Sequence, residues 1–215
     1  GATYTTTSQM SNATAFDLRE ASQAYPEWVR ANFLQVSASV TPATIALAQQ
    51  ITEEAQATNP YDQAKAIESW LRTNMAYNES IPRPPNGRDA VDWFLFTQQE
   101  GYCNYYASAM IVMLRSQGIP ARMAAGFAQG DYIPDEGGYV VTERDAHTWV
   151  EAYFPGYGWI EFEPTAAQQP LQREGDDIVT PQEIPPQQPQ VTPTFTAKPP
   201  PSPTHSSRPR SGTPT

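Results

Sequence analysis

The hydrophobic pattern changes from helical spacing to strand spacing near residue 120. Before that point, two segments begin with Thr41-Pro42 and Asn59-Pro60, where a capping residue precedes a proline suited to the first turn of a helix. Apolar side chains then recur every three or four positions in both segments, as they do on one face of a helix. The pattern also predicts two shorter elements, an edge strand at Tyr4–Thr7 and a helix at Asp89–Phe96.

A further long helix is predicted from Cys103 to Gln117. Gly118 and Pro120 follow it, and a glycine with a proline shortly after it is a common helix end. The inward-facing stripe of this helix consists of Ala107, Met110, Ile111 and Leu114. Cys103 lies on the same stripe, one turn ahead of these residues. We therefore expect the only cysteine of the chain at the N-terminus of a helix.

Beyond Pro120 the apolar segments are short and strand-like, and turn signals such as Gly137-Gly138 separate them. Four strands are predicted, at Arg122–Ala128, Tyr139–Thr142, His147–Phe154 and Trp159–Phe162. Helices first and strands afterwards favour an α+β domain, in which the helix of Cys103 packs on an antiparallel sheet.

The chain of 215 residues is not uniform in composition. Twelve of its 22 prolines lie between Pro170 and Thr215, a stretch with one aromatic residue and little apolar surface to bury. We therefore expect residues 169–215 to form a disordered, proline-rich linker or tail. Residues 1–168 are expected to form one domain, with residues 1–40 as an N-terminal extension that packs on its core.

Charge and residue counts exclude several classes of function. The formal net charge of −10 does not suit a nucleic-acid-binding protein, which needs a basic surface. One cysteine and two histidines cannot form a disulfide framework or a four-ligand zinc site. Asp131, Asp135 and Glu136 lack the spacing of a calcium-binding loop, so no metal or other cofactor is expected.

No apolar run approaches the ~20 residues of a membrane span. The first residue is Gly1, which indicates a processed product or a piece of a longer chain.

Cys103 is a candidate nucleophile because of its place in the helix. A thiol at a helix N-terminus lies at the positive end of the helix dipole, which favours the thiolate. A base is also needed, and His147 is the one histidine outside the proline-rich tail, which holds His205. Three carboxylates are candidates for orienting its imidazole: Asp145, Glu161 and Glu163. From spacing alone, an inert core cysteine and a structural histidine are the commoner interpretation.

The stretches GYCNYYASAMIVMLRSQGIPARMAAGF and DAHTWVEAYFPGYGWIEFEPT resemble the core motifs of the transglutaminase-like superfamily. In that family the catalytic cysteine begins a helix, the histidine lies in an Ala-His-x-Trp-Val-Glu strand, and the acid lies just before Pro-Thr. The resemblance implies Cys103, His147 and Glu163 as a catalytic triad, in a transglutaminase-like, papain-like cysteine-enzyme fold. Glu163 stands where the family usually has aspartate. Because glutamate is one methylene longer, either its strand lies further from His147 or its side chain folds back.

The upstream stretches LAQQIT and VDWFLF are similar to the extracytoplasmic domain of bacterial membrane-embedded members of this family. The resemblance implies a cysteine-dependent acyl transferase that acts on glutamine side chains of a protein or peptide through a thioester, with an amine or water as acceptor. It also implies a location outside the cytoplasmic membrane, with the tail leading to a membrane segment outside this sequence. We expect a monomer. The alternatives are a cysteine peptidase or amidase with the same triad, and a non-catalytic binding module on a membrane tether.

One donor to the oxyanion is expected to be the backbone N–H of Cys103. The second donor stays open among Gln98, Gln99, Asn104 and an indole N–H. The aromatic side chains expected near the site are Tyr102, Tyr105, Tyr106 and Trp149.

Overall fold

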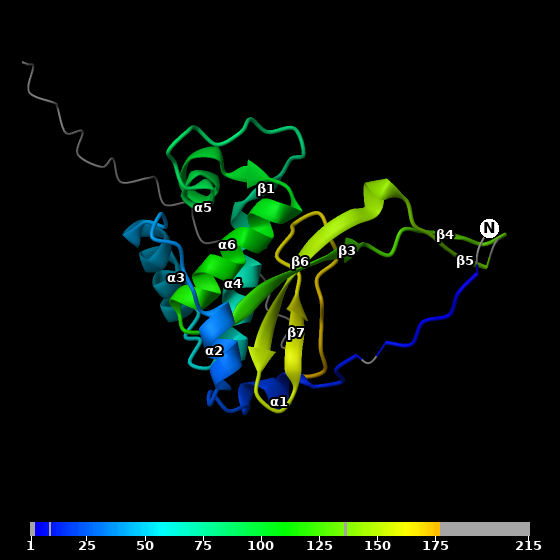
Figure 1. Cartoon of the computed structure of the whole chain (residues 1–215), viewed down its shortest axis with the longest axis horizontal. Coiled ribbons are helices and arrows are strands. Elements are labelled where there is room, and N and C mark those ends of the chain that lie inside the picture. Colours follow the sequence, from blue (N-terminus) through cyan, green and yellow to red (C-terminus); the bar gives the residue numbers. More distant parts are fainter. Residues whose placement is uncertain (1–2, 9, 136, 177–215) are drawn as a thin grey trace, which may run out of the picture.

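The computed structural model describes residues 3–8, 10–135 and 137–176 of the chain (Figure 1). The α-helices in this part are α1 (Ala15–Arg19), α2 (Glu27–Phe33), α3 (Pro42–Glu54), α4 (Pro60–Asn74), α5 (Ala90–Trp93) and α6 (Cys103–Ser116). A π-helical turn, η1 (Phe94–Gln98), continues α5, and a 3-10 turn, η2 (Glu143–Asp145), precedes the longest strand. The α-helices therefore come before the main sheet in the sequence, as the hydrophobic pattern predicts.

The long helices begin and end at the predicted signals. α3 and α4 each begin at a proline, and the Asn59 side chain caps α4 by accepting from the backbone N–H of Asp62 at 2.9 Å. α6 ends at Ser116 with Gln117 as its C-cap, and Gly118 follows with a φ of +78°, in the left-handed region that favours glycine. The helix predicted at Asp89–Phe96 is divided, because the α-helical part ends at Trp93 and the chain then widens into η1.

The main sheet has three antiparallel strands in the order β3–β6–β7. These strands are β3 (Ala121–Phe127), β6 (Ala146–Phe154) and β7 (Gly158–Phe162), within one residue of the predicted bounds. Two small sheets accompany it: β1 (Ala76–Tyr77) pairs in parallel with β2 (Glu100–Gly101), and β4 (Asp131–Ile133) forms an antiparallel hairpin with β5 (Gly138–Val140). The domain belongs to the α+β class, as expected.

The edge strand expected at Tyr4–Thr7 is wrong. These residues form no strand in the part of the chain that the structure describes, and Tyr4 is 84% exposed. β-branched and aromatic residues favour a strand only where a neighbouring strand accepts their hydrogen bonds. Among the described residues, no strand of the three sheets pairs with this segment, so its hydrogen bonds lack such a partner.

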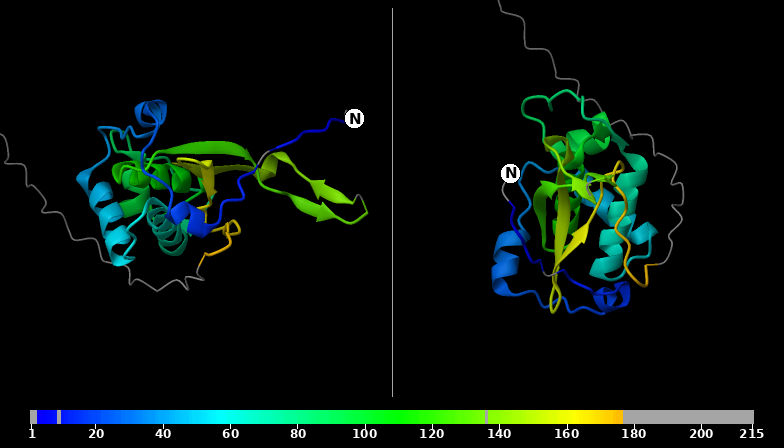
Figure 2. Two further views of the ribbon diagram at one scale, coloured as in Figure 1. Left: turned by 90° about the horizontal axis from the view of Figure 1, so that it is seen from below. Right: turned by 90° about the vertical axis from the view of Figure 1, so that its right-hand side faces the viewer.

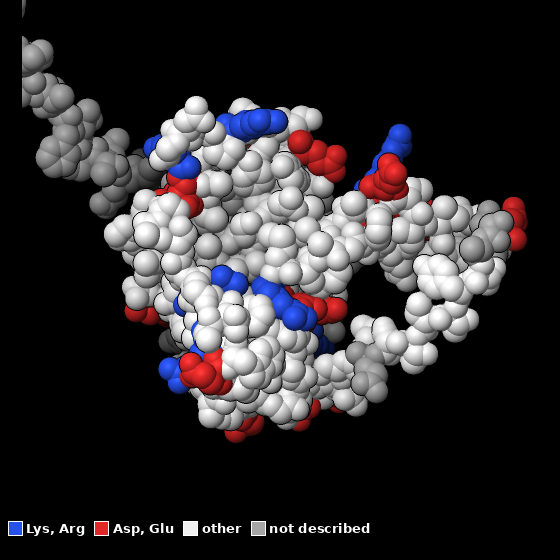
Figure 3. Space-filling model, in the orientation of Figure 1, with Lys and Arg blue, Asp and Glu red and all other residues white. Residues whose placement is uncertain are grey.

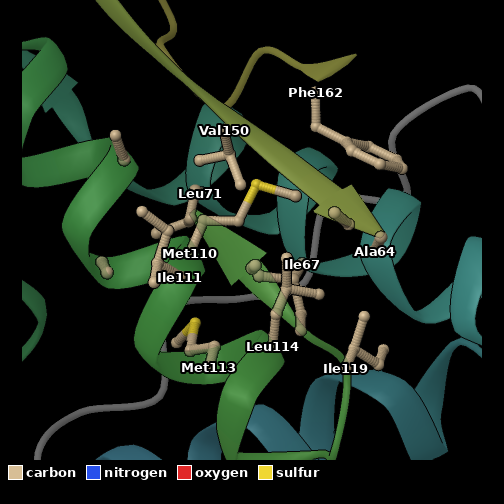
Figure 4. Close-up of a cluster of buried hydrophobic side chains, with 14 of the residues drawn as sticks. Ala64, Ile67, Leu71, Met110, Ile111, Met113, Leu114, Ile119, Val150 and Phe162 are labelled. Carbon is tan, nitrogen blue, oxygen red and sulfur yellow. The ribbon is translucent and has the colours of Figure 1, made fainter. Parts of the chain in front are cut away.

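α6 lies at the centre of the core, between the main sheet and the helices α3 and α4. Figure 4 shows Met110 and Leu114 of α6 beside Ile67 and Leu71 of α4, with Val150 of β6 next to Met110 and Leu71. All five side chains are completely buried. This packing fixes α6 against β6, and it thereby sets the position of the first turn of α6 relative to the start of β6.

The β4–β5 hairpin projects away from the helices, as both Figure 1 and the left view of Figure 2 show. Its two aromatic rings, Tyr132 and Tyr139, contact each other edge to face with centroids 5.2 Å apart, and both are largely exposed. In Figure 3, residues other than Lys, Arg, Asp and Glu cover most of this arm; acidic groups lie at its tip, and acidic and basic groups lie together at its base. Gly130 lets the two strands of the arm approach, because a Cβ there would lie 2.2 Å from the carbonyl oxygen of Val140.

Residues after 168 still contact the helices α1 and α4. Arg19 donates to the carbonyl of Gly175 at 2.9 Å, and the Tyr61 hydroxyl donates to Asp176 at 2.6 Å. The remainder of the predicted tail, residues 177–215, lies outside the described residues, and the domain boundary stays a prediction. Within the described ranges, no helix has both the length and the apolar character that crossing a membrane requires.

Candidate active site

Cys103 is the first residue of α6, directly after the N-cap residue Tyr102. The parallel β1–β2 pair holds the chain that leads into it, and the backbone N–H of Asn78 donates to the carbonyl of Gly101 at 2.9 Å. A Cβ at Gly101 would lie 3.1 Å from the Phe94 ring, so any side chain there would push against the ring. The small sheet and this glycine thus fix the point at which α6 begins, with the Cys103 thiol half-buried.

His147 is the second residue of β6, opposite Gly126 of β3, and only 8% of its side chain is exposed. Its Nε2 atom lies 2.5 Å from Oε2 of Glu163. Because Nε2 faces Glu163, the other ring nitrogen, Nδ1, is the one available to the Cys103 sulfur. A histidine held in this way at one nitrogen can exchange a proton at the other.

Glu163 is the first residue after β7. Its Oε1 atom accepts from the backbone N–H of Thr165 at 2.9 Å, while Oε2 contacts His147. The side chain therefore folds back over its own chain, which is one of the two arrangements expected for a carboxylate longer than aspartate. Both oxygens have partners, so the carboxylate is fixed in its orientation as well as in its position.

The electrostatic shifts of the thiol and the imidazole favour the same charge state. Burial raises the pKa of the Cys103 thiol, but its interactions with His147 and Thr148 outweigh burial and hold the pKa below the ordinary value of 9.0. Burial lowers the pKa of His147, but the interactions with Cys103 and Glu163 raise it from 6.5 to about 9. Each shift favours the charged form of its group, and a thiolate beside an imidazolium is the reactive state of a nucleophilic cysteine.

The other two carboxylate candidates lie away from the imidazole. Asp145 accepts from the backbone N–H and the hydroxyl of Thr142, at 2.6 and 2.9 Å, and so caps η2. Glu161 lies opposite Glu151 of the neighbouring strand. Of the three candidates, Glu163 is the one that the structure brings to His147.

The candidates for the second oxyanion donor lie in different elements. Gln98 donates to Glu100 at 2.8 Å, and Gln99 ends η1 in a left-handed conformation, so both belong to the turn before β2. Asn104 lies next to the thiol: its Oδ1 atom is 3.8 Å from the Cys103 sulfur and accepts from the Thr148 hydroxyl at 3.0 Å.

The indole of Trp149 lies beside the imidazole of His147, with the two rings 22° from parallel and their centroids 6.3 Å apart. Its Nε1 atom is buried and has no hydrogen-bond partner among the described residues. Of the three tyrosines expected near the site, Tyr106 lies in the core, where its hydroxyl donates to the carbonyl of Met75 at 2.8 Å. Tyr102 and Tyr105 contact each other edge to face at the start of α6.

Two residues of α4 that contact the Glu163 backbone are not among the residues predicted from the sequence. Glu68 accepts from the backbone N–H of Glu163 at 2.7 Å, and Arg72 donates to its carbonyl at 2.8 Å. The two side chains are four positions apart, so they project from one face of the helix. In the sequence they resemble the polar border of an apolar helix stripe, and nothing local distinguishes them from solvent-exposed residues.

Known proteins match both the sequence and the fold. The family model described as the Transglutaminase-like superfamily matches residues 45–164, a range that contains Cys103, His147 and Glu163. The uncharacterized protein YebA of Bacillus subtilis (strain 168) is 42% identical over 139 residues, which are 62% of this chain and 19% of that protein. A protein-glutamine gamma-glutamyltransferase of Pseudomonas aeruginosa is 36% identical over 132 residues, 61% of this chain and 19% of that protein.

Among solved structures, the crystal structure of the periplasmic domain of TgpA from Pseudomonas aeruginosa matches with a TM-score of 0.56 and 32% sequence identity. The match covers 66% of this chain and 48% of that domain. The chain thus spans about a fifth of the length of the curated relatives and about half of the solved domain.

Proposed function

Because the chain belongs to the transglutaminase-like superfamily, we propose that it transfers the acyl group of a glutamine carboxamide through a thioester at Cys103. The observation that carries the proposal is a half-buried thiol of lowered pKa beside an imidazole whose far nitrogen contacts a fixed carboxylate. The Pseudomonas aeruginosa relative named as a protein-glutamine gamma-glutamyltransferase supports glutamine side chains as the substrate group.

In the first half of the reaction, the Cys103 thiolate attacks the carbonyl carbon of the carboxamide and a C–S bond forms. The oxygen becomes an oxyanion next to the backbone N–H of Cys103, which as a first-turn residue has no acceptor within α6. The C–N bond then breaks, and the departing nitrogen takes the Nδ1 proton of His147 and leaves as ammonia. The product of this half-reaction is a thioester with a neutral imidazole beside it.

In the second half, an amine attacks the thioester carbon and His147 accepts the proton that the amine loses. The C–S bond breaks and the thiolate returns beside the imidazolium, whose Nε2–H group stays hydrogen-bonded to Glu163 throughout. A lysine side chain as acceptor gives a cross-link between two polypeptides, and water gives a deamidated glutamate.

Incorporation of a labelled primary amine into a glutamine-containing protein tests this proposal. We expect mass spectrometry to find the label on glutamine side chains, and to find none with the variants Cys103→Ala and His147→Ala. Deamidation alone would indicate that water is the preferred acceptor of the same thioester. A cleaved backbone would instead support the peptidase alternative. An unreactive Cys103 thiol would refute both enzymatic functions and favour a binding module.

We also propose that the domain works outside the cytoplasmic membrane, since the matched solved structure is a periplasmic domain. A thiol reagent that cannot cross the cytoplasmic membrane, but is small enough to pass the pores of an outer membrane where one is present, should label Cys103 of the full-length protein in intact cells. The same protein with Cys103→Ala gives the background. Labelling that requires disruption of the cytoplasmic membrane would refute this location.

A further inference from the structure

The backbone of Glu163 lies just beyond the hydrogen bonds of the main sheet. The last pair between β6 and β7 joins Val150 to Phe162, and β7 ends there. The N–H of Glu163 instead donates to Oε1 of Glu68 at 2.7 Å, and its carbonyl accepts from Nη1 of Arg72 at 2.8 Å. Two side chains of α4 thus form the hydrogen bonds to the N–H and C=O groups of Glu163 at the point where the strand ends.

Arg72 holds the following residues as well. Its Nη1 atom also donates to the carbonyl of Thr165 at 2.6 Å, and its Nη2 atom donates to the carbonyl of Gln168 at 2.7 Å. Thr165 is the residue whose N–H donates to Oε1 of Glu163. One guanidinium therefore fixes both the backbone from which the carboxylate projects and the turn that supplies one of its two hydrogen bonds.

Glu68 is a buried carboxylate, with 2% of the residue exposed. Its second oxygen accepts from the ammonium of Lys65, which also donates to the carbonyl of Leu171 at 3.2 Å. A buried carboxylate costs stability unless both oxygens have partners, and an apolar residue would fill the same space at lower cost. An apolar residue, however, would leave the N–H of Glu163 without an acceptor.

We propose that Glu68 and Arg72 are positioning residues for the candidate triad, and that they set the distance between the Glu163 carboxylate and the His147 imidazole. The inference rests on the proposed function, because it concerns the reactivity of Cys103. The charged and titratable groups that face Glu163 are His147 from β6, with Cys103 of α6 behind it, and Glu68, its partner Lys65 and Arg72 from α4.

The test measures how fast an alkylating reagent modifies Cys103 as a function of pH, in the full 215-residue chain. Glu68→Ala and Arg72→Met remove the two contacts, so the carboxylate can leave His147 and the thiolate loses its imidazolium partner. We expect the pH midpoint of alkylation to rise by about one unit, which is about tenfold slower modification on the acid side of the profile. Glu68→Gln retains an oxygen for the N–H of Glu163 and should restore most of the wild-type profile.

Ile67→Ala is the matched control, because Ile67 is a completely buried neighbour of Glu68 on α4. It should lower the melting temperature and leave the pH midpoint unchanged. If Glu68→Ala does not fold, Arg72→Lys decides instead, since a lysine keeps the charge but cannot reach three carbonyls with one fork.

An unchanged midpoint in the folded α4 variants, with a raised midpoint in His147→Ala, would overturn this inference and leave the proposed function standing. An unchanged midpoint in His147→Ala would overturn the proposed function and this inference together. An equal shift in Ile67→Ala would mean that loosened packing, rather than these two contacts, controls the thiol, which also overturns the inference.

Discussion

Replacement of Glu163 by glutamine should weaken the thiolate–imidazolium pair without a large change in shape. In the structure Oε2 of Glu163 lies 2.5 Å from Nε2 of His147, and Oε1 accepts from the N–H of Thr165. Nε2 of the protonated imidazole and the backbone N–H of Thr165 both donate to the carboxylate. A glutamine has one oxygen and one NH2 group, so in either orientation one of these two donors faces another donor.

The size of the effect follows from the loss of charge. A hydrogen bond to a charged group contributes ~1.5–3 kcal/mol and a neutral one ~0.5–1.5 kcal/mol, so the imidazolium loses ~1–1.5 kcal/mol. At 1.36 kcal/mol per pKa unit, this lowers the pKa of His147 by about one unit from its value of about 9. Solvent screens little of it, because each of the two side chains is only 8% exposed. A weaker imidazolium stabilises the thiolate less, so the pKa of Cys103 rises.

Two titrations measure these opposite movements: the imidazole resonances of His147 by NMR, and the ultraviolet absorbance of the Cys103 thiolate. In Glu163→Gln the histidine midpoint should fall and the thiol midpoint should rise. Glu161→Gln is the control, since Glu161 lies two residues earlier, opposite Glu151, and should move neither midpoint. If Glu163→Gln titrates like the wild-type protein at both groups, the carboxylate does not support the ion pair and the reasoning fails.

Three further outcomes are expected. The rate of acyl transfer should increase as pH rises through the lowered pKa of the Cys103 thiol. It should fall as pH rises through about 9, because His147 then loses the proton that the departing ammonia needs. A transfer rate that still increases above that pH would contradict this. Met110→Ala should lower the free energy of unfolding by ~2–5 kcal/mol in urea titrations, because Met110 of α6 is completely buried against α4 and β6. A loss under ~1 kcal/mol would contradict this and show that the core closes over the cavity. Gly126→Ala should slow alkylation of Cys103, because the new Cβ would lie 3.1 Å from the Trp149 indole that stacks on His147. Gly138→Ala, where a Cβ meets nothing within 4 Å in the projecting arm, should leave that rate unchanged.

The elements that carry Cys103 and His147 obey local rules, which is why the sequence predicts them well. The apolar stripe of α6, its glycine after the last turn and the short segments around turn signals all act over a few residues. The arm formed by β4 and β5 was predicted only in part, since Tyr139–Thr142 was expected as a strand and its partner Asp131–Ile133 was not. Strand pairing depends on which chain lies alongside, and the failed strand at Tyr4–Thr7 has the same cause.

The choice among the three carboxylates could not be made from residue pattern alone. Glu161 and Glu163 have the same strand parity, so alternation places both on one face of the sheet. The contact with His147 depends instead on where β7 ends and on a bond from Glu163 to Glu68, which are 95 positions apart in the sequence. Sequence patterns of a single helix or strand do not contain such long-range contacts.

The extra methylene of Glu163 and the two contacts from α4 are connected, because α4 places the backbone from which the longer side chain reaches back. A residue inside the sheet would have its backbone held by the neighbouring strand, and a carboxylate there would point straight out from the sheet face. Glu163 lies one position past the last paired residue, so its backbone is free to follow Glu68 and Arg72 towards α4. A longer side chain can then reach back to Nε2 of His147 while its other oxygen accepts from Thr165. The glutamate is therefore compatible with a triad geometry because α4, rather than the sheet, determines where its backbone lies.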